Sequence, residues 1–378
     1  MRKHGALPPI LSVVFVDTLG YATVVPLLPF ALRGHGAAPL AIGAVFAAFS
    51  LCQLVTAPYL GRLSDRIGRR PVLALSQVGS IFGFALLALS SSYPVVFVSR
   101  VIDGCSAGNI SVCYAAILDS KTEDERRRGI SALGAAAGGG ILVGLGLSAF
   151  LAGFGLTAAA LAAMFLSLLS LALTWLAVPE TRKRDRASLN VSAALRLPEL
   201  RRGGIFVALS ATLQAAFFLT LPAYLAGALG LHVQPATVLI AGLIGVAAAF
   251  QLVALPRLLR HLGPGATARW LVFVALAGAA LIAAAAHGSP AVVVGAAIFA
   301  TAAAALATVS ALLLAEARPD SPMGLVMGLN SSSATAGQMV GPLAGYAAFG
   351  IGGTRGLGLG CIALGVFAAL GLRGLGHG

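Results

Sequence analysis

The sequence predicts an all-α protein that crosses a membrane twelve times, as two pseudo-repeated halves of six helices. Three observations support this fold class. Of the 378 residues, 58% are hydrophobic and 10% are charged, whereas a soluble domain carries about 25% charged residues. The apolar stretches are continuous and about 20 residues long, as a membrane-spanning helix requires. One hydrophilic segment, residues 179–203, and a short repeated sequence divide the chain into two parts.

The twelve predicted spans are separated by short turns rich in Gly, Pro or polar residues. They cover residues 9–32, 39–60, 71–91, 94–118, 129–152, 155–178, 204–229, 236–258, 268–287, 290–315, 324–349 and 355–373. We interpret the first as a span rather than a signal peptide, because its apolar run continues past Asp17 without a small-residue cleavage site. The expected domains are an N-terminal half (1–178), a cytoplasmic linker (179–203) and a C-terminal half (204–378).

The positive charges are distributed asymmetrically along this array. Net charge is +13, which in a soluble protein would suggest a nucleic-acid partner. Here 22 of the 25 Lys and Arg residues fall on the side of the N-terminus if every span crosses once. Cytoplasmic loops of membrane proteins collect Lys and Arg. We therefore expect both termini in the cytoplasm, a bacterial plasma (inner) membrane and no nucleic-acid partner.

A short sequence recurs at corresponding places in the two halves. Gln53–Gly68, QLVTAPYLGRLSDRIG, resembles Gln251–Gly263, QLVALPRLLRHLG, at the ends of the second and eighth spans. Tandem six-helix halves are a common transporter architecture. The repeat therefore favours duplication of a six-span unit.

The loop GRLSDRIGRRP (Gly61–Pro71) resembles the signature between the second and third spans of the major facilitator superfamily. VDTLGYATVVPLLP, SRVIDGCSAGNIS and NSSSATAGQMVGPLAG are similar to the first, fourth and eleventh spans of its twelve-helix drug:proton antiporter branch, especially the tetracycline-resistance-like members. The resemblance implies a proton-coupled secondary transporter that exports small amphipathic molecules by alternating access, as multidrug resistance proteins do. We expect it to act as a monomer.

The basic loop contains the residues of a predicted cytoplasmic gate. Asp65 and Arg69 lie four residues apart and would face the same way on one helical turn. Glycines at positions 61 and 68 would permit tight bends. The resemblance implies that an Asp/Arg pair and an acid at the end of the fourth span latch one access state. The candidate gate residues are Gly61, Asp65, Arg66, Gly68, Arg69, Arg70 and Asp119. The alternative is a basic loop with an incidental aspartate.

Three ionisable residues lie within predicted spans, where a charge costs several kcal/mol (about 2.5–3.5 on insertion scales). Arg100 and Asp103 share one face of the fourth span, and Asp17 lies in the first. We predict that Asp17 and Asp103, with Arg100, carry out proton coupling; the alternative is that Arg100 and Asp103 form a structural ion pair. At 1.5 Å per residue, Asp17 is ~12 Å and Arg100 ~27 Å from the cytoplasmic end, so we expect no direct contact between these two side chains.

The resemblance also implies a central path lined by the first, fourth, seventh and tenth spans. The substrate-cavity candidates are Tyr21, Ser106, Asn109, Tyr114 and Gln214. Those of the fourth span would share its polar side, and simple interhelical hydrogen bonds are the alternative for them.

Two departures from the antiporter pattern keep other functions open. The fifth span has Gly144 followed by leucine, where the antiporter hallmark is Gly-Pro, and the third span has Gly83 near the position of the acid of tetracycline exporters. Tetracycline is therefore not expected as the main substrate. Uptake or facilitated diffusion of a sugar or organic acid, and a non-transporting membrane sensor, remain alternatives. No P-loop, metal cluster or nucleophile pattern is present, so we expect no enzyme activity, cofactor or metal.

Overall fold

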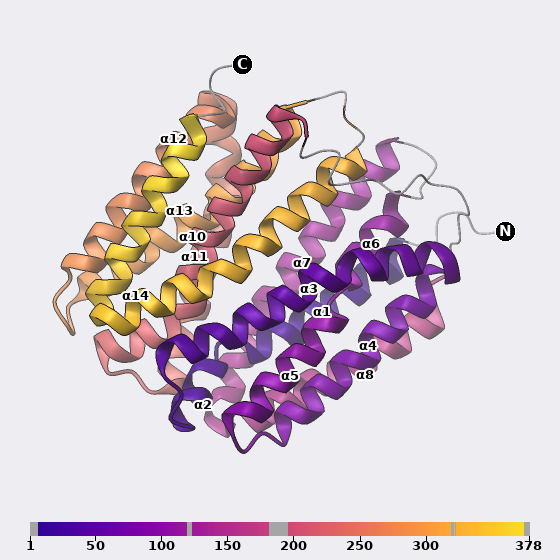
Figure 1. The fold of residues 1–378 in the computed structure, drawn as a ribbon, viewed down its shortest axis with the longest axis horizontal. Coiled ribbons are helices and arrows are strands. Elements are labelled where there is room, and N and C mark those ends of the chain that lie inside the picture. Colours follow the sequence, from indigo (N-terminus) through magenta and orange to yellow (C-terminus); the bar gives the residue numbers. More distant parts are fainter. Residues whose placement is uncertain (1–6, 119–122, 181–195, 319–320, 322, 374–378) are drawn as a thin grey trace. The chain divides into compact units, whose positions relative to one another are not determined.

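A computed structural model describes residues 7–118, 123–180, 196–318, 321 and 323–373. These residues form helices joined by short turns, and none of them lies in a β-strand (Figure 1). Two compact units are present. Unit 1 contains Met1–Gly36 and Ala48–Ser188, and unit 2 contains Ala37–Ala47 and Leu189–Gly378.

Most of the helices belong to one unit only. Unit 1 holds α1 (Leu7–Val24), α2 (Leu28–Gly34), α4 (Arg69–Ala88), α5 (Tyr93–Ser106), α6 (Asn109–Leu118), α7 (Glu123–Leu151), the 3₁₀ turn η1 (Ala152–Phe154) and α8 (Gly155–Ala177). Unit 2 holds α10 (Pro198–Leu229), α11 (Val233–Val253), α12 (Leu255–Ala284), α13 (Pro290–Glu316) and α14 (Met323–Arg373). Helix α3 (Pro39–Ile67) begins in unit 2 and continues in unit 1.

Ten helices of the described chain are long and apolar enough to cross a membrane, so this is a multi-pass membrane protein. Two of the ten, Arg128–Ala177 and Leu325–Leu372, have 50 and 48 residues, about twice what one crossing needs. Each contains a break in helical geometry. Gly155 follows η1 with φ +82°, and Gly353 has φ +58°. Both values lie in the left-handed region that glycine adopts without steric cost.

The structure corrects two of the predicted helix boundaries. The fourth span, predicted over 94–118, is one candidate span (Tyr93–Ile117), but its helix is interrupted, since α5 ends at Ser106 and α6 begins at Asn109. The turn between them brings Gly104 and Gly108 against α3, where an added Cβ would lie 2.5 Å from the Phe49 carbonyl oxygen and 2.4 Å from Leu60 Cδ1. The seventh span was predicted to start at 204, whereas α10 starts at Pro198.

Glycines allow the closest helix pairs to approach. In unit 1, Gly140 and Gly144 of α7 face α1, and an added Cβ would lie 2.4 Å from the Phe15 carbonyl oxygen and 2.5 Å from that of Leu19. In unit 2, Gly337, Gly341 and Gly345 of α14 face α10 in the same way. Small residues spaced four apart let helix backbones meet, which is a main source of helix association in membranes.

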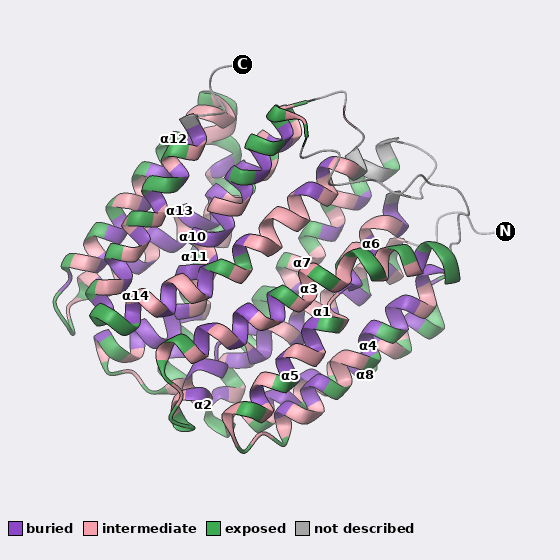
Figure 2. Cartoon of the chain, in the orientation of Figure 1, coloured by how far each residue is buried: buried purple, intermediate pink, exposed green. Residues whose placement is uncertain are grey.

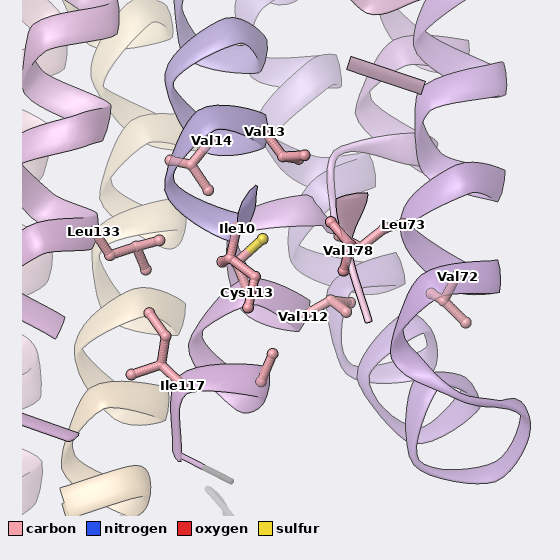
Figure 3. Close-up of a cluster of buried hydrophobic side chains, with 11 residues drawn as sticks. Ile10, Val13, Val14, Val72, Leu73, Val112, Cys113, Ile117, Leu133 and Val178 are labelled. Carbon is pink, nitrogen blue, oxygen red and sulfur yellow. The ribbon is translucent and has the colours of Figure 1, made fainter. Parts of the chain in front are cut away.

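Figure 2 shows that buried and exposed residues alternate along individual helices, so most helices have one packed face. In unit 1 a buried apolar cluster gathers side chains from α1, α4, α6 and α7 and from the residue after α8 (Figure 3). Its members are Ile10, Val13, Val14, Val72, Leu73, Val112, Cys113, Ala116, Ile117, Leu133 and Val178. All four helices contribute from their ends near residues 7, 69, 118 and 123, which are the ends predicted to be cytoplasmic.

Candidate functional site

Arg100 and Asp103 form a buried ion pair on α5. Arg100 Nη1 lies 3.1 Å from Asp103 Oδ2, and the two side chains are 2% and 5% exposed. Gly83 of α4 makes room for the pair, since a Cβ there would be 3.0 Å from Asp103 Cβ. Pairing keeps two buried charges together, whereas either alone would be strongly destabilising.

The guanidinium of Arg100 has few other neighbours that accept hydrogen bonds. Its Cζ lies 5.2 Å from the centre of the Phe84 ring on α4, a cation–π distance. Its Nη2 is buried without a hydrogen-bond partner among the described residues. The Tyr21 phenol is close enough to interact electrostatically with it, and the centre of the Tyr21 ring lies 5.4 Å from that of Phe49, with the two rings tilted by 30°. Asp103 is therefore the main partner that offsets the buried positive charge of Arg100.

Asp17 of α1 has a different environment from Asp103. Asn109, the first residue of α6, donates a 2.6 Å hydrogen bond from Nδ2 to Asp17 Oδ2. Asp17 makes no ion pair among the described residues. Because α6 starts directly after the break at 107–108, the break places Asn109 against α1. Gln53 of α3 stabilises the same break by donating a 3.0 Å hydrogen bond to the Ala107 carbonyl oxygen.

Sequence reasoning missed two polar residues next to Asp17, Gln77 and Ser170, and a third residue, Thr174, that is hydrogen-bonded to Gln77. Gln77 of α4 is fully buried, and its Nε2 donates 2.8 Å hydrogen bonds to Ser170 Oγ and Thr174 Oγ1 of α8. The Ser170 hydroxyl and the Gln77 amide are also within hydrogen-bonding reach of the Asp17 carboxylate. A signal existed in the sequence: Ser170 and Thr174 are four residues apart on an apolar helix, and Gln77 is the one amide of its span.

The apolar cluster lies one helical turn away from this polar group. Val13 precedes Asp17 by four residues, Leu73 precedes Gln77 by four, Cys113 follows Asn109 by four and Val178 follows Thr174 by four. Residues four apart on a helix lie one above the other. Within unit 1, the cluster therefore separates the Asp17 network from the helix ends predicted to be cytoplasmic.

The other cavity candidates are not brought together. Ser106 ends α5 and its hydroxyl packs against Gly79 of α4, where a Cβ would clash with it. Tyr114 packs against the apolar cluster. Gln214 is a half-buried residue of α10 in unit 2. Ser106, Asn109 and Tyr114, which were predicted to share one polar side of the fourth span, have separate neighbours: Gly79 of α4, Asp17 of α1 and the apolar cluster.

The basic loop has Asp65 and Arg69 in contact, but not on one helix as predicted. Helix α3 ends at Ile67 and α4 begins at Arg69, with Gly68 between them at φ +107°. Arg69 Nη1 lies 2.7 Å from Asp65 Oδ1 across this turn. Arg69 is buried, and its guanidinium also donates to Ser64 Oγ. Gly61 makes no bend, because it lies inside α3.

Glu180 is a further residue of this loop region that the sequence reasoning missed. Its Oε1 accepts a 2.8 Å hydrogen bond from the backbone N–H of Arg69, the first residue of α4. A carboxylate at a helix N-terminus is favourable because it meets unpaired N–H groups and the positive end of the helix dipole.

The remaining gate candidates have separate surroundings. Arg70 stacks on Trp175 of α8, with Cζ 4.5 Å from the ring centre. Arg66 is exposed, and Asp119 lies outside the described residues.

Comparison with known proteins gives the family. The profile of the Major Facilitator Superfamily matches residues 10–288, well over half of the chain. The chain belongs to the major facilitator superfamily. It is therefore a transporter-family protein, and the resemblance predicted from its motifs is confirmed.

The curated relatives include the tetracycline resistance protein of class E from Escherichia coli, 38% identical over 137 residues (35% of this chain and 34% of that protein). The class C protein from Escherichia coli is 32% identical over 196 residues (51% and 50%). Bovine major facilitator superfamily domain-containing protein 10 is 33% identical over 220 residues (50% and 48%). The chain thus matches between about a third and a half of the length of these relatives.

Solved structures show the same fold over nearly the whole chain. The human organic anion transporter MFSD10 (TETRAN) aligns with a TM-score of 0.75 at 22% identity and covers 98% of each chain. The nucleoside transporter NupG also has a TM-score of 0.75, at 14% identity, over 97% of each chain. These likenesses establish the major facilitator fold.

Proposed function

We propose that this protein is a proton-coupled exporter of small amphipathic molecules. The observation that carries the proposal is Asp17, an intramembrane carboxylate that is hydrogen-bonded to Asn109 and has no cationic partner in the described chain. Ionisable groups inside a membrane commonly mark ion pathways. The similarity to tetracycline resistance proteins supports export. In this proposal the protein binds a small-molecule substrate and protons, and it acts as a monomer in a bacterial plasma membrane.

We further propose twelve crossings in two repeated halves. Dividing the two longest apolar segments at Gly155 and Gly353 turns ten segments into twelve. Corresponding contacts in the two units support duplication. Gln53 of α3 donates to the end of α5, and Gln251 of α11 accepts a 2.8 Å hydrogen bond from Thr308 of α13. Glycine-mediated packing of α7 on α1 likewise corresponds to that of α14 on α10.

In the proposed transport cycle, the two halves rock about a central site, as in other transporters built from repeats. The Asp65–Arg69 pair and Glu180 hold the turn between α3 and α4, which acts as the cytoplasmic gate together with Asp119. Both termini lie in the cytoplasm, because this orientation leaves most Lys and Arg residues on the inner side.

The test is accumulation of a panel of fluorescent amphipathic cations, anions and neutral dyes in an efflux-deficient bacterium. Cells expressing the native chain should accumulate less of at least one dye than cells with the empty vector, and a proton uncoupler should remove the difference. Asp17→Asn, which keeps the shape of the side chain but cannot exchange a proton, should also remove it. Gln251→Leu is a control, because it removes a hydrogen-bonded amide from unit 2, which does not contain Asp17.

Two results would contradict export. Higher accumulation in cells with the native chain would favour uptake of the compound, and equal accumulation for every dye would favour metabolite transport or a non-transporting role. Export that continues in Asp17→Asn and with the uncoupler would overturn proton coupling.

A further inference from the structure

The two intramembrane carboxylates of unit 1 differ in whether a cation is among their partners. Asp103 is bound by Arg100, and a guanidinium has donors only and remains charged. Asp17 is bound by the amide of Asn109 and lies within reach of the Gln77 amide and the Ser170 hydroxyl. Amide and hydroxyl groups can each donate or accept a hydrogen bond.

This difference decides which protonation states each site can accommodate. An ionised carboxylate only accepts hydrogen bonds, whereas a protonated carboxyl group also donates one through its O–H. Arg100 cannot accept that bond. The nearby Ser80 hydroxyl can accept it, but the positive charge of Arg100, 3.1 Å away, favours the ionised form of Asp103. The partners of Asp17 can satisfy both states, provided that their amides and hydroxyls can reverse direction.

The amide groups of Asn109 and Gln77 are placed so that they can turn. Asn109 Oδ1 and Gln77 Oε1 are buried without a hydrogen-bond partner among the described residues, while the nitrogens of both amides are engaged. A half-turn exchanges oxygen and nitrogen, which are nearly equal in size. One amide atom then lacks a partner both before and after the turn, so the half-turn does not increase the number of unsatisfied polar atoms.

The hydroxyl groups next to Gln77 can follow the same reversal. Ser170 and Thr174 now accept hydrogen bonds from Gln77 Nε2. After the turn their O–H groups donate to Gln77 Oε1 instead, because a hydroxyl proton rotates freely about its C–O bond. The whole network therefore reverses without moving a helix.

Few other ionisable groups face Asp17. Asp103 of α5 and Cys113 of α6 are close enough to interact with it electrostatically. The spanning parts of α7 and α8 and the part of α4 beyond Arg70 contain no titratable residue. Asp17 is therefore the group of this network that is placed to exchange a proton.

We propose that Asn109 and Gln77 are positioning residues that allow Asp17 to take up and release a proton inside the membrane, while Asp103 stays ionised against Arg100. The proton comes from water and returns to water, and only the O–H bond on Asp17 forms and breaks. This inference rests on the proposed function and adds the residues that support its proton step.

Infrared difference spectroscopy of the full chain in lipid nanodiscs, without substrate, tests this proposal. The chain has 12 Asp and Glu residues, so the Asp17 band is the part of the carboxyl C=O signal at low pH that the native protein and Gln251→Leu show and Asp17→Asn lacks. Asn109→Leu should move the pH midpoint of that band by about one unit or more, because ionised Asp17 loses a stronger hydrogen bond than protonated Asp17 does. Gln77→Leu should move the midpoint by a smaller amount, because both N–H groups of Gln77 are donated to Ser170 and Thr174 and the variant acts on Asp17 through those hydroxyls. Asn109→Ser, whose hydroxyl both donates and accepts, should move it less.

The proposal would be overturned if Asp17→Asn gave the same carboxyl C=O difference spectrum as the native protein, or if both leucine variants had the midpoint of Gln251→Leu. If the leucine variants do not fold, the native protein still provides a test. Its side-chain amide bands, assigned with Asn109→Ser and Gln77→Ser, should change with the Asp17 band, and amide bands that stay fixed would refute the reversal. An Asp17 band that titrates as expected in a protein without proton-driven export would support this inference and overturn the proposed function.

Discussion

Gly68 determines the geometry of the turn that joins α3 to α4. Its φ of +107° lies in a region that residues with a Cβ rarely adopt, and a Cβ there would lie 2.4 Å from Glu180 Oε1. Glycine is therefore required twice, for the backbone conformation and for the approach of the Glu180 carboxylate to the start of α4.

Gly68→Ala should lower the free energy of unfolding by about 1–3 kcal/mol, the usual cost of a strained backbone conformation. Gly61→Ala is the matched control, since Gly61 is helical and an added Cβ meets nothing within 4 Å. It should be neutral or stabilise by up to about 1 kcal/mol. Thermal unfolding of both purified variants measures the difference. Equal melting temperatures would show that the turn does not depend on glycine.

The second prediction at the residue scale concerns the stability of the Arg100–Asp103 pair. Asp103→Leu leaves an unpaired buried guanidinium and should cost about 3–5 kcal/mol, whereas the double variant Arg100→Met/Asp103→Leu should recover most of that loss. Thermal unfolding of the single and double variants in detergent measures it. A double variant no more stable than the single one would mean that Arg100 has roles in packing beyond its charge.

At the level of helices, α7 packs on α1 through one glycine face. Gly144→Ala should destabilise the protein by about 1–3 kcal/mol, because the added Cβ would meet the Leu19 carbonyl oxygen at 2.5 Å and push the helices apart. Gly146→Ala, on the same helix with nothing within 4 Å, should be neutral or stabilising. Melting temperatures of the two variants decide this, and a Gly144→Ala protein as stable as the native one would contradict the packing.

The break between α5 and α6 shows why the candidate site could be predicted only in part. The sequence identified Asp17, Arg100, Asp103 and Asn109 individually, because polar residues in an apolar span are conspicuous. It did not predict the break between α5 and α6, since residues 106–109 (SAGN) contain no proline. The break arises where Gly104 and Gly108 meet α3, a contact between segments far apart in the sequence, and it directs Asn109 toward Asp17.

For the whole molecule, twelve crossings predict that residues 153 and 352 lie outside the cell. Cysteines introduced at exposed Gly153 and Gly352, in a chain whose four native cysteines are replaced by serine, should react with a membrane-impermeant maleimide in intact cells. A cysteine at exposed Arg66 should react only in permeabilised cells. If a cysteine at 153 or 352 does not react in intact cells, the apolar segment that contains it (Arg128–Ala177 or Leu325–Leu372) does not cross the membrane twice.

The amino-acid sequence alone was enough to identify a helical membrane protein of the major facilitator superfamily, because hydrophobic length and loop motifs are local properties. It also predicted the separation of Asp17 from Arg100, since both depths follow from helix rise. Which partner each ionisable residue has became known only from the packed helices. Asn109 and Gln77 reach Asp17 from α6 and α4, and Glu180 reaches the start of α4 from the end of α8. Such contacts depend on how helices pack against each other, and the periodicity of a single helix does not contain that information.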